Sequence, residues 1–171
     1  NVSSAASDVY KRQAICHAMG LPYAQLVAGI KTLKGLPHRC ELVGVRDGVQ
    51  FVNDSKGTNV GATVAALEGL ADGQNIILVA GGEGKGQAFA PLAKAVSQHA
   101  KHTVLIGRDA VSIAEALDAA TPHTFADDME SAVRTATDIA ASGDIVLLSP
   151  ACASLDLSLI HISEPTRQFR I

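Results

Sequence analysis

The segment IILVAGGEGKG, residues 76–86, joins five consecutive apolar residues to a glycine-rich loop that carries Lys85. A continuous apolar run of this length is typical of a strand buried on both faces, as in a parallel sheet. Ligands of open α/β sheets bind outside the carboxyl ends of the strands, which is where this loop falls. The segment therefore predicts a central strand followed directly by a candidate binding loop.

The same pattern, an apolar run followed by small and polar residues, recurs along the chain. Between the runs, apolar residues repeat at the three- and four-residue spacing of helices. Strands that alternate with helices predict an α/β fold with a mainly parallel sheet. The further strands are expected at 49–52, 103–106, 123–125 and 144–148, with helices from about 60, 89, 110 and 129.

An antiparallel hairpin is expected before this alternation begins. Residues 41–45 and 49–52 are apolar-rich runs on either side of Arg46-Asp47-Gly48. Asp-Gly between such runs favours a type I′ turn, because glycine accepts the positive φ that this turn requires. The predicted fold is a Rossmann-like α/β domain: an open, mostly parallel sheet with an antiparallel edge hairpin and helices on both faces.

Residue types at the helix ends predict where the helices begin and stop. Asp109 and the pair Asp127-Asp128 are expected N-caps of the last two helices. Thr58 or Asn59 is expected to cap the first helix; alternatively, free backbone N–H groups there and the Thr58 hydroxyl could face an anion. Gly143 is the expected stop of the last helix.

Composition excludes several classes of protein. The 171 residues are 47% hydrophobic and 18% charged, which favours a packed core over disorder. A net charge of −3 provides no basic surface for nucleic acid. The three cysteines are too few and too scattered for a disulfide framework, and no apolar run reaches the roughly 18 residues of a membrane span. We therefore expect a cytoplasmic protein with reduced thiols.

The two ends of the chain differ from its middle. Residues 1–13 and 158–171 have no hydrophobic period, and we expect both to be foreign or disordered tails outside the core. Residues 14–35 predict two short helical pieces broken near Pro22. The α/β domain is therefore expected to span 36–157.

The loops themselves favour an anionic small molecule without matching a standard phosphate motif. Lys85 is followed by glycine and glutamine, whereas the Walker pattern requires serine or threonine after its lysine. The loop 81–86 could also be a plain surface turn, and Arg39 could be either a solvated charge or a fork for phosphate. Residues 149–154 are small, so a ligand could approach the backbone there, and Ser154 adds a hydroxyl.

Four motifs occur in order along the chain: GLPHR at 35–39, NDSKGTN at 53–59, GGEGKG at 81–86 and LSPACAS at 148–154. Together they resemble the carboxy-terminal domain of the Mur ligase family. Residues 14–35 resemble the last helices of that family's central, ATP-binding domain.

The resemblance implies an ATP- and magnesium-dependent acid–amino-acid ligase of peptidoglycan synthesis. The pattern is most similar to members that join D-glutamate to UDP-N-acetylmuramoyl-L-alanine through an activated carboxylate. By motif position, Thr58, Lys85 and Ser154 would hold the carboxylates of D-glutamate. Most magnesium ligands would belong to the central domain. No nucleic acid or membrane insertion is implied.

The same resemblance implies roles for four further residues. Arg39 would meet an ATP phosphate, and Asp54 would lie on the ribose side of the nucleotide. Lys56, between these groups, and His38, lining the closed cleft, would be the catalytic residues.

The chain also departs from the family pattern. Gly57 replaces the usual alanine, which we expect to be a mild change, and the aromatic segment that normally follows Leu157 is missing. The phosphate loop and the muramoyl-binding domain are not in this sequence, so the chain alone is expected to be inactive. Two alternatives remain: a non-catalytic Rossmann-like module that binds an anionic metabolite, and a related amide ligase for another amino acid. An Asp-Asn-Pro-Arg motif, used by the diaminopimelate-adding relative, does not occur.

Overall fold

A computed structural model describes residues 18–20, 22, 35–117 and 121–153. The chain divides into two compact units, residues 1–36 and 37–171, and every strand and helix named below lies in the second unit. The expected tails at 1–13 and 158–171, Ser154 and nearly all of the helical region 14–35 lie outside the described residues.

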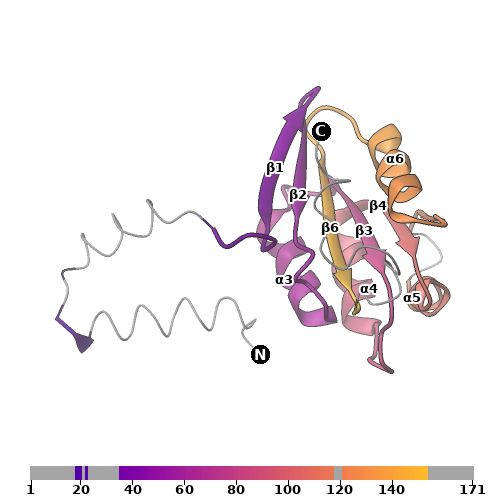
Figure 1. The fold of residues 1–171 in the computed structure, drawn as a ribbon, viewed down its shortest axis with the longest axis horizontal. Coiled ribbons are helices and arrows are strands. Elements are labelled where there is room, and N and C mark those ends of the chain that lie inside the picture. Colours follow the sequence, from indigo (N-terminus) through magenta and orange to yellow (C-terminus); the bar gives the residue numbers. More distant parts are fainter. Residues whose placement is uncertain (1–17, 21, 23–34, 118–120, 154–171) are drawn as a thin grey trace. The chain divides into compact units, whose positions relative to one another are not determined.

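One sheet of six strands runs through the second unit in the order β1-β2-β6-β3-β4-β5 (Figure 1). β1 pairs with β2 antiparallel, and every other pair is parallel. The predicted parallel sheet with an antiparallel edge hairpin is therefore confirmed, and the apolar run at 76–80 is interior. The strands are β1 (Glu41–Arg46), β2 (Val49–Asn53), β3 (Ile76–Gly81), β4 (Ala100–Ile106), β5 (His123–Phe125) and β6 (Ile145–Ala151).

The hairpin turn has the geometry that its sequence predicts. Asp47 has a φ of 52° and Gly48 a φ of 80°, so both central residues are left-handed. Positive φ at both positions is the requirement of a type I′ turn, whose twist matches that of the flanking strands.

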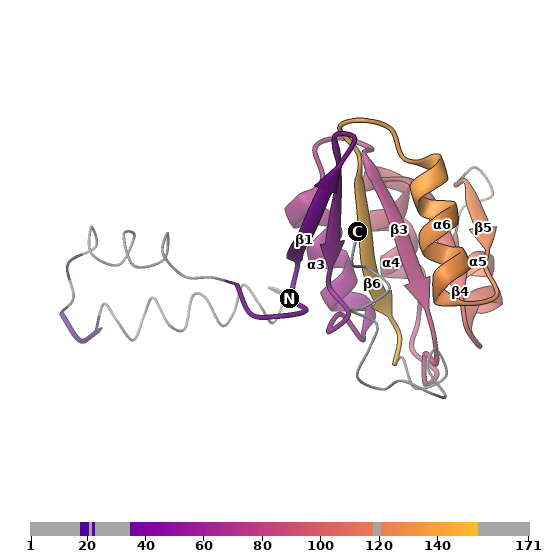
Figure 2. The ribbon, with the colours of Figure 1, turned by 45° about the horizontal axis from the view of Figure 1, so that its top comes forward.

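Helices cover both faces of the sheet, as predicted. Figure 2 shows α6 over β3 and β4, with α3, α4 and α5 on the opposite face. The helices are α3 (Val60–Leu70), α4 (Ala90–His99), α5 (Ala110–Ala116) and α6 (Met129–Ile139).

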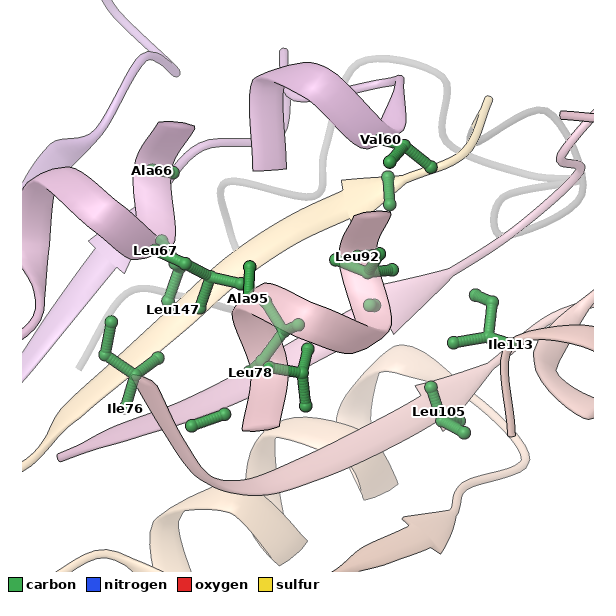
Figure 3. Packing of buried hydrophobic residues seen from close by; sticks show 14 of the residues in the cluster. Val60, Ala66, Leu67, Ile76, Leu78, Leu92, Ala95, Leu105, Ile113 and Leu147 are labelled. Atoms are coloured by element: carbon green, nitrogen blue, oxygen red, sulfur yellow. The ribbon is translucent and has the colours of Figure 1, made fainter. Parts of the chain in front are cut away.

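Alternate residues of the interior strands supply two separate cores. Ile76 and Leu78 of β3 belong to the core under α3, α4 and α5, whereas Ile77 and Val79 belong to the core under α6. All four side chains are fully buried, each contributing roughly 1.5–3 kcal/mol to folding. Figure 3 shows the larger core, with Leu67, Leu92 and Ile113 from the helices close to Leu78, Leu105 and Leu147 from the strands.

Two of the expected helix caps are confirmed. Asn59 caps α3, and its side chain accepts a hydrogen bond from the Ala62 N–H at 3.0 Å. Asp128 caps α6 in a capping box with Ser131. Short polar side chains at these positions satisfy N–H groups that the first helical turn leaves unpaired.

The other two expectations about the helix ends fail wholly or in part: Asp109 is the N-cap residue of α5 but makes no side-chain cap, and Gly143 does not end α6. The Asp109 side chain makes no capping bond to α5, because its carboxylate accepts the N–H of Gly84 instead. α6 ends at Ile139, so Gly143 is not its stop; Gly143 lies in the following turn and donates its N–H to the Gly48 carbonyl. None of the helices in the described ranges is long and apolar enough to cross a membrane.

Candidate functional site

The carboxyl ends of β2, β6 and β3 lie side by side. Leu148 of β6 is in register with Asn53 of β2 on one side and with Val79 of β3 on the other. Because these strands are parallel, the segments that follow them leave the same edge of the sheet. These segments include residues 54–59 after β2, Cys152 and Ala153 after β6, and residues 82–89 after β3.

A buried polar network joins the loop after β2 to the end of β6. The Ser149 hydroxyl donates to Asp54 Oδ2 at 2.7 Å, and the Thr63 hydroxyl lies 2.9 Å from Ser149 Oγ. Asp54 Oδ1 accepts the Cys40 N–H at 3.2 Å. Ser149 and Thr63 are fully buried, and Asp54 is only 7% exposed. Both carboxylate oxygens of Asp54 are thus engaged within the domain.

Burial dominates the electrostatics of Asp54. Removal from water raises the pKa of its carboxyl above the ordinary 3.8, because the charged form loses hydration. The hydrogen bond from Ser149, the bonds from Cys40 and the positive charge of Arg39 each lower the pKa without cancelling that increase. The Asp54 carboxyl therefore holds its proton more tightly than an exposed aspartate does.

The segment that contains His38 and Arg39 is held against the loop after β2. Asn53 Nδ2 lies 3.1 Å from His38 Nδ1, and Nδ1 must accept because an amide nitrogen only donates. The Lys56 N–H also donates to the His38 carbonyl at 3.2 Å. His38 has a φ of 64° and Cys40 a φ of 46°, a left-handed backbone that non-glycine residues adopt at a cost. His38, Arg39, Asp54 and Lys56 are therefore brought together.

Lys85 lies in a tight turn after β3. The Gln87 N–H donates to the Gly84 carbonyl at 3.1 Å. The central residues, Lys85 and Gly86, have φ values of 52° and 74°, the signs of a type I′ turn. Gly86 suits this backbone, whereas Lys85 is strained in it. Asp109 Oδ2 accepts the Gly84 N–H at 2.6 Å, so the turn is also fixed from the end of β4.

Three cationic side chains at this edge have no close partner among the described residues. Arg39, Lys56 and Lys85 are exposed, and none of their side chains makes a hydrogen bond or ion pair within the described ranges. Thr58 is exposed as well. The His38 side chain is 34% exposed, and its Nδ1 lies 3.9 Å from Glu41 Oε2. Such side chains are available to an anionic ligand.

The N-terminus of α3 is not the open anion site that one interpretation of the sequence suggests. The Val60 N–H donates to Gln87 Oε1 at 3.2 Å, and the Ala62 N–H donates to Asn59 Oδ1. Since protein side chains occupy these two N–H groups, the idea that they are free for an anion is wrong. The Thr58 hydroxyl remains available.

Three polar residues of the site were not assigned a role by the sequence analysis. Thr63 and Ser149 complete the network around Asp54, and Gln87 joins the turn after β3 to α3 and β6. Ser149 lies within the LSPACAS motif at 148–154, so the sequence pattern already pointed to its segment. Thr63 lies among mostly apolar and small residues of α3, and Gln87 follows a loop that does not match the Walker pattern, so neither residue carried such a signal.

Gly57 lies against the same network. A Cβ on this residue would meet Asp54 Oδ2 and Ser149 Oγ. An alanine here would require the Ser149–Asp54 pair to move, so in this chain the choice between glycine and alanine at position 57 is not the mild change that we expected.

The described residues contain no group of three or more His, Cys, Asp or Glu side chains that could hold a metal ion. The magnesium ligands that we expect in a central domain are not among the described residues.

The fold and this edge define a class: an open α/β domain with exposed cationic side chains at the carboxyl ends of its strands. The Mur ligase family, glutamate ligase domain, matches residues 38–152. The chain therefore belongs to the Mur ligase family through this domain.

Individual relatives agree with this assignment. The chain is 52% identical over 153 residues to UDP-N-acetylmuramoylalanine--D-glutamate ligases of Burkholderia mallei and Burkholderia pseudomallei, covering 89% of this chain and 30% of each relative. It thus spans about a third of the length of these relatives.

Solved structures share the fold at low sequence identity. UDP-N-acetylmuramate-alanine ligase from Thermotoga maritima aligns with a TM-score of 0.61 at 14% identity, over 82% of this chain and 32% of that one. The bifunctional folylpolyglutamate synthase/dihydrofolate synthase from Yersinia pestis aligns with a TM-score of 0.53 at 20% identity, over 68% and 29%.

Proposed function

We propose that this chain is the D-glutamate-binding and nucleotide-completing domain of a ligase that joins D-glutamate to UDP-N-acetylmuramoyl-L-alanine. The observation that carries the proposal is the 52% identity, over 153 residues, to ligases named for this reaction. The proposed cellular setting is cytoplasmic peptidoglycan synthesis, and through it cell shape and division.

Lys85, Thr58 and Ser154 form the proposed D-glutamate site. D-glutamate carries two carboxylates, and an exposed ammonium with nearby hydroxyl donors suits such a dianion. The exposed Lys85 and Thr58 side chains support the proposal. Lys85 also adopts a left-handed backbone, and strain of this kind is concentrated at ligand-binding positions.

The loop cluster around Asp54 forms the proposed nucleotide-facing part. Arg39 would contact a phosphate and Asp54 would lie on the ribose side, while Lys56 and His38 would face the reacting groups. The exposed charges of Arg39 and Lys56 fit the polyphosphate of ATP. ATP, with magnesium held mainly by a central domain, would supply the activation that makes a carboxylate a competent acyl donor.

Within this scheme the domain orients the amine donor. Lys85 and the hydroxyls would fix both carboxylates of D-glutamate, so that its free amine points at the activated carbonyl. Holding two reactants in one geometry removes much of the entropic part of the barrier. Lys56, between the two sets of ligands, would stabilise negative charge as it develops on the transferred groups.

A chimeric ligase tests this function. It consists of the amino-terminal part of the Burkholderia mallei ligase joined, at the matching position, to this chain. We expect ATP-dependent product formation from UDP-N-acetylmuramoyl-L-alanine with D-glutamate in preference to other amino acids, and no phosphate release by the chain alone.

Two results would contradict the proposal. Preference for another amino acid would favour a related amide ligase. A folded chimera without ligase activity, combined with binding of another anionic metabolite to the chain, would favour a non-catalytic module.

A further inference from the structure

Gln87 connects three elements at the carboxyl edge. Its Oε1 accepts the N–H of Val60, the first residue of α3, at 3.2 Å. Its Nε2 donates to the carbonyl of Ala151, the last residue of β6, at 2.6 Å. Its own backbone N–H closes the turn by bonding to Gly84 at 3.1 Å. One side chain thus ties the loop after β3 to α3 and to β6.

The turn that Gln87 closes is the one that carries Lys85. Lys85 has a φ of 52°, and such a conformation persists only where surrounding contacts enforce it. Asp109 holds the amino-terminal end of the turn through the Gly84 N–H, and Gln87 holds the carboxyl-terminal end. The Lys85 side chain is exposed and makes no hydrogen bond or ion pair within the described ranges. Its position therefore depends on these two anchors.

The two side-chain hydrogen bonds of Gln87 also link elements that lie close in sequence to the proposed ligand residues. Thr58 lies two positions before Val60, whose N–H Gln87 accepts, and Ser154 lies three positions after Ala151, to whose carbonyl Gln87 donates. The loops bearing Thr58 and Lys85 and the last residue of β6 are thus all joined to one partly buried amide.

We infer that Gln87 is a positioning residue, whose side-chain amide holds the Lys85 turn at the distance from α3 and β6 that D-glutamate binding requires. The inference takes its substrate, D-glutamate, from the proposed function. The hydrogen bonds of Gln87 to Val60 and Ala151 do not depend on that proposal. Gln87 touches no substrate in this scheme and acts through Lys85.

Amide hydrogen exchange on the 171-residue chain tests the anchoring alone. In Gln87→Ala we expect exchange of the Val60 amide and of the amide at position 87 to accelerate about three- to tenfold. The Val60 amide loses its acceptor, and the turn that pairs the amide of residue 87 with the Gly84 carbonyl loses the side chain that holds it. Gln98→Ala, an exposed glutamine on α4, is the matched control and should leave both amides unchanged. Unchanged exchange in Gln87→Ala would overturn the inference.

Kinetics of the chimeric ligase test the consequence. Gln87→Ala should raise the KM for D-glutamate about three- to tenfold, with the KM for ATP and kcat nearly unchanged. Gln87→Glu keeps the length but cannot donate to Ala151 as a carboxylate, so it should fail to restore the KM. Full recovery in Gln87→Glu, or an equal rise in both KM values, would show that Gln87 only fills space.

The two experiments separate failure of this inference from failure of the proposed function. If the unmodified chimera does not use D-glutamate while exchange accelerates in Gln87→Ala, the anchoring stands and the proposed substrate is wrong. If the chimera uses D-glutamate and Gln87→Ala changes neither exchange nor KM, the inference is wrong and the function stands.

Discussion

Ser149 donates a hydrogen bond from its hydroxyl to Asp54 Oδ2 at 2.7 Å, although the residues are 95 positions apart. The bond joins the end of β6 to the loop after β2, and it satisfies a carboxylate that is almost entirely buried. A buried carboxylate without donors is strongly unfavourable, so this pair helps to fix the loop that carries Lys56 and Thr58.

Ser149→Ala should lower the free energy of unfolding by about 1–3 kcal/mol, because it removes a donor from buried Asp54 and a partner from Thr63. Urea unfolding of the chain measures the effect. Ser112→Ala, at an exposed position of α5, is the control and should stay within about 0.5 kcal/mol. Equal stability of the two variants would contradict a structural role for the Ser149–Asp54 bond.

Asp54→Asn should change how stability depends on pH. The folded state raises the pKa of Asp54 above 3.8, so it binds the carboxyl proton more tightly than the unfolded chain does. Wild-type protein should therefore lose stability relative to Asp54→Asn as pH rises from about 4 through the raised pKa, and the difference should level off above it. Thermal unfolding between about pH 4 and 7 measures this difference. A wild-type advantage that grows with pH would contradict burial as the dominant effect.

Lys85→Gly should stabilise the domain while weakening its proposed function. Glycine adopts a positive φ without the steric strain that a lysine Cβ causes at this exposed position, so the free energy of unfolding should rise by up to about 1 kcal/mol. In the chimeric ligase, both Lys85→Gly and Lys85→Ala should raise the KM for D-glutamate about ten- to a hundredfold, since a charge-assisted bond is lost.

Lys94→Ala, which removes an exposed lysine from α4, is the control for this pair and should change neither quantity. The KM for UDP-N-acetylmuramoyl-L-alanine should also stay nearly constant in the Lys85 variants. An unchanged KM for D-glutamate in both would exclude Lys85 from the site.

Asn59→Ala should destabilise the domain by about 1 kcal/mol, because it leaves an N–H group at the start of α3 without its acceptor. Asn59→Asp should recover most of that loss, since a carboxylate accepts the same bond and interacts favourably with the helix N-terminus. Urea unfolding distinguishes them. Equal losses in both variants would mean that the Asn59 cap does not contribute.

The sequence determined the architecture, because the patterns that define it are local. The continuous apolar run at 76–80 identified β3 as an interior strand, and Asp47-Gly48 identified the hairpin turn. Burial on both faces follows directly from the run of apolar residues, and a positive φ follows from the residue types. Residue chemistry likewise limited the caps to Thr58 or Asn59 and to Asp127 or Asp128, and the structure selects Asn59 and Asp128.

Only the tertiary structure decided which polar side chains meet. Asp109 has the residue type of an N-cap, yet it binds Gly84 across the carboxyl edge of the sheet. Thr63 and Gln87 carry no sequence signal, because their partners come from strands and helices distant along the chain. Helix caps and turns depend on neighbours within a few residues, whereas this network depends on how parallel strands align. That alignment arises only when the whole sheet has packed.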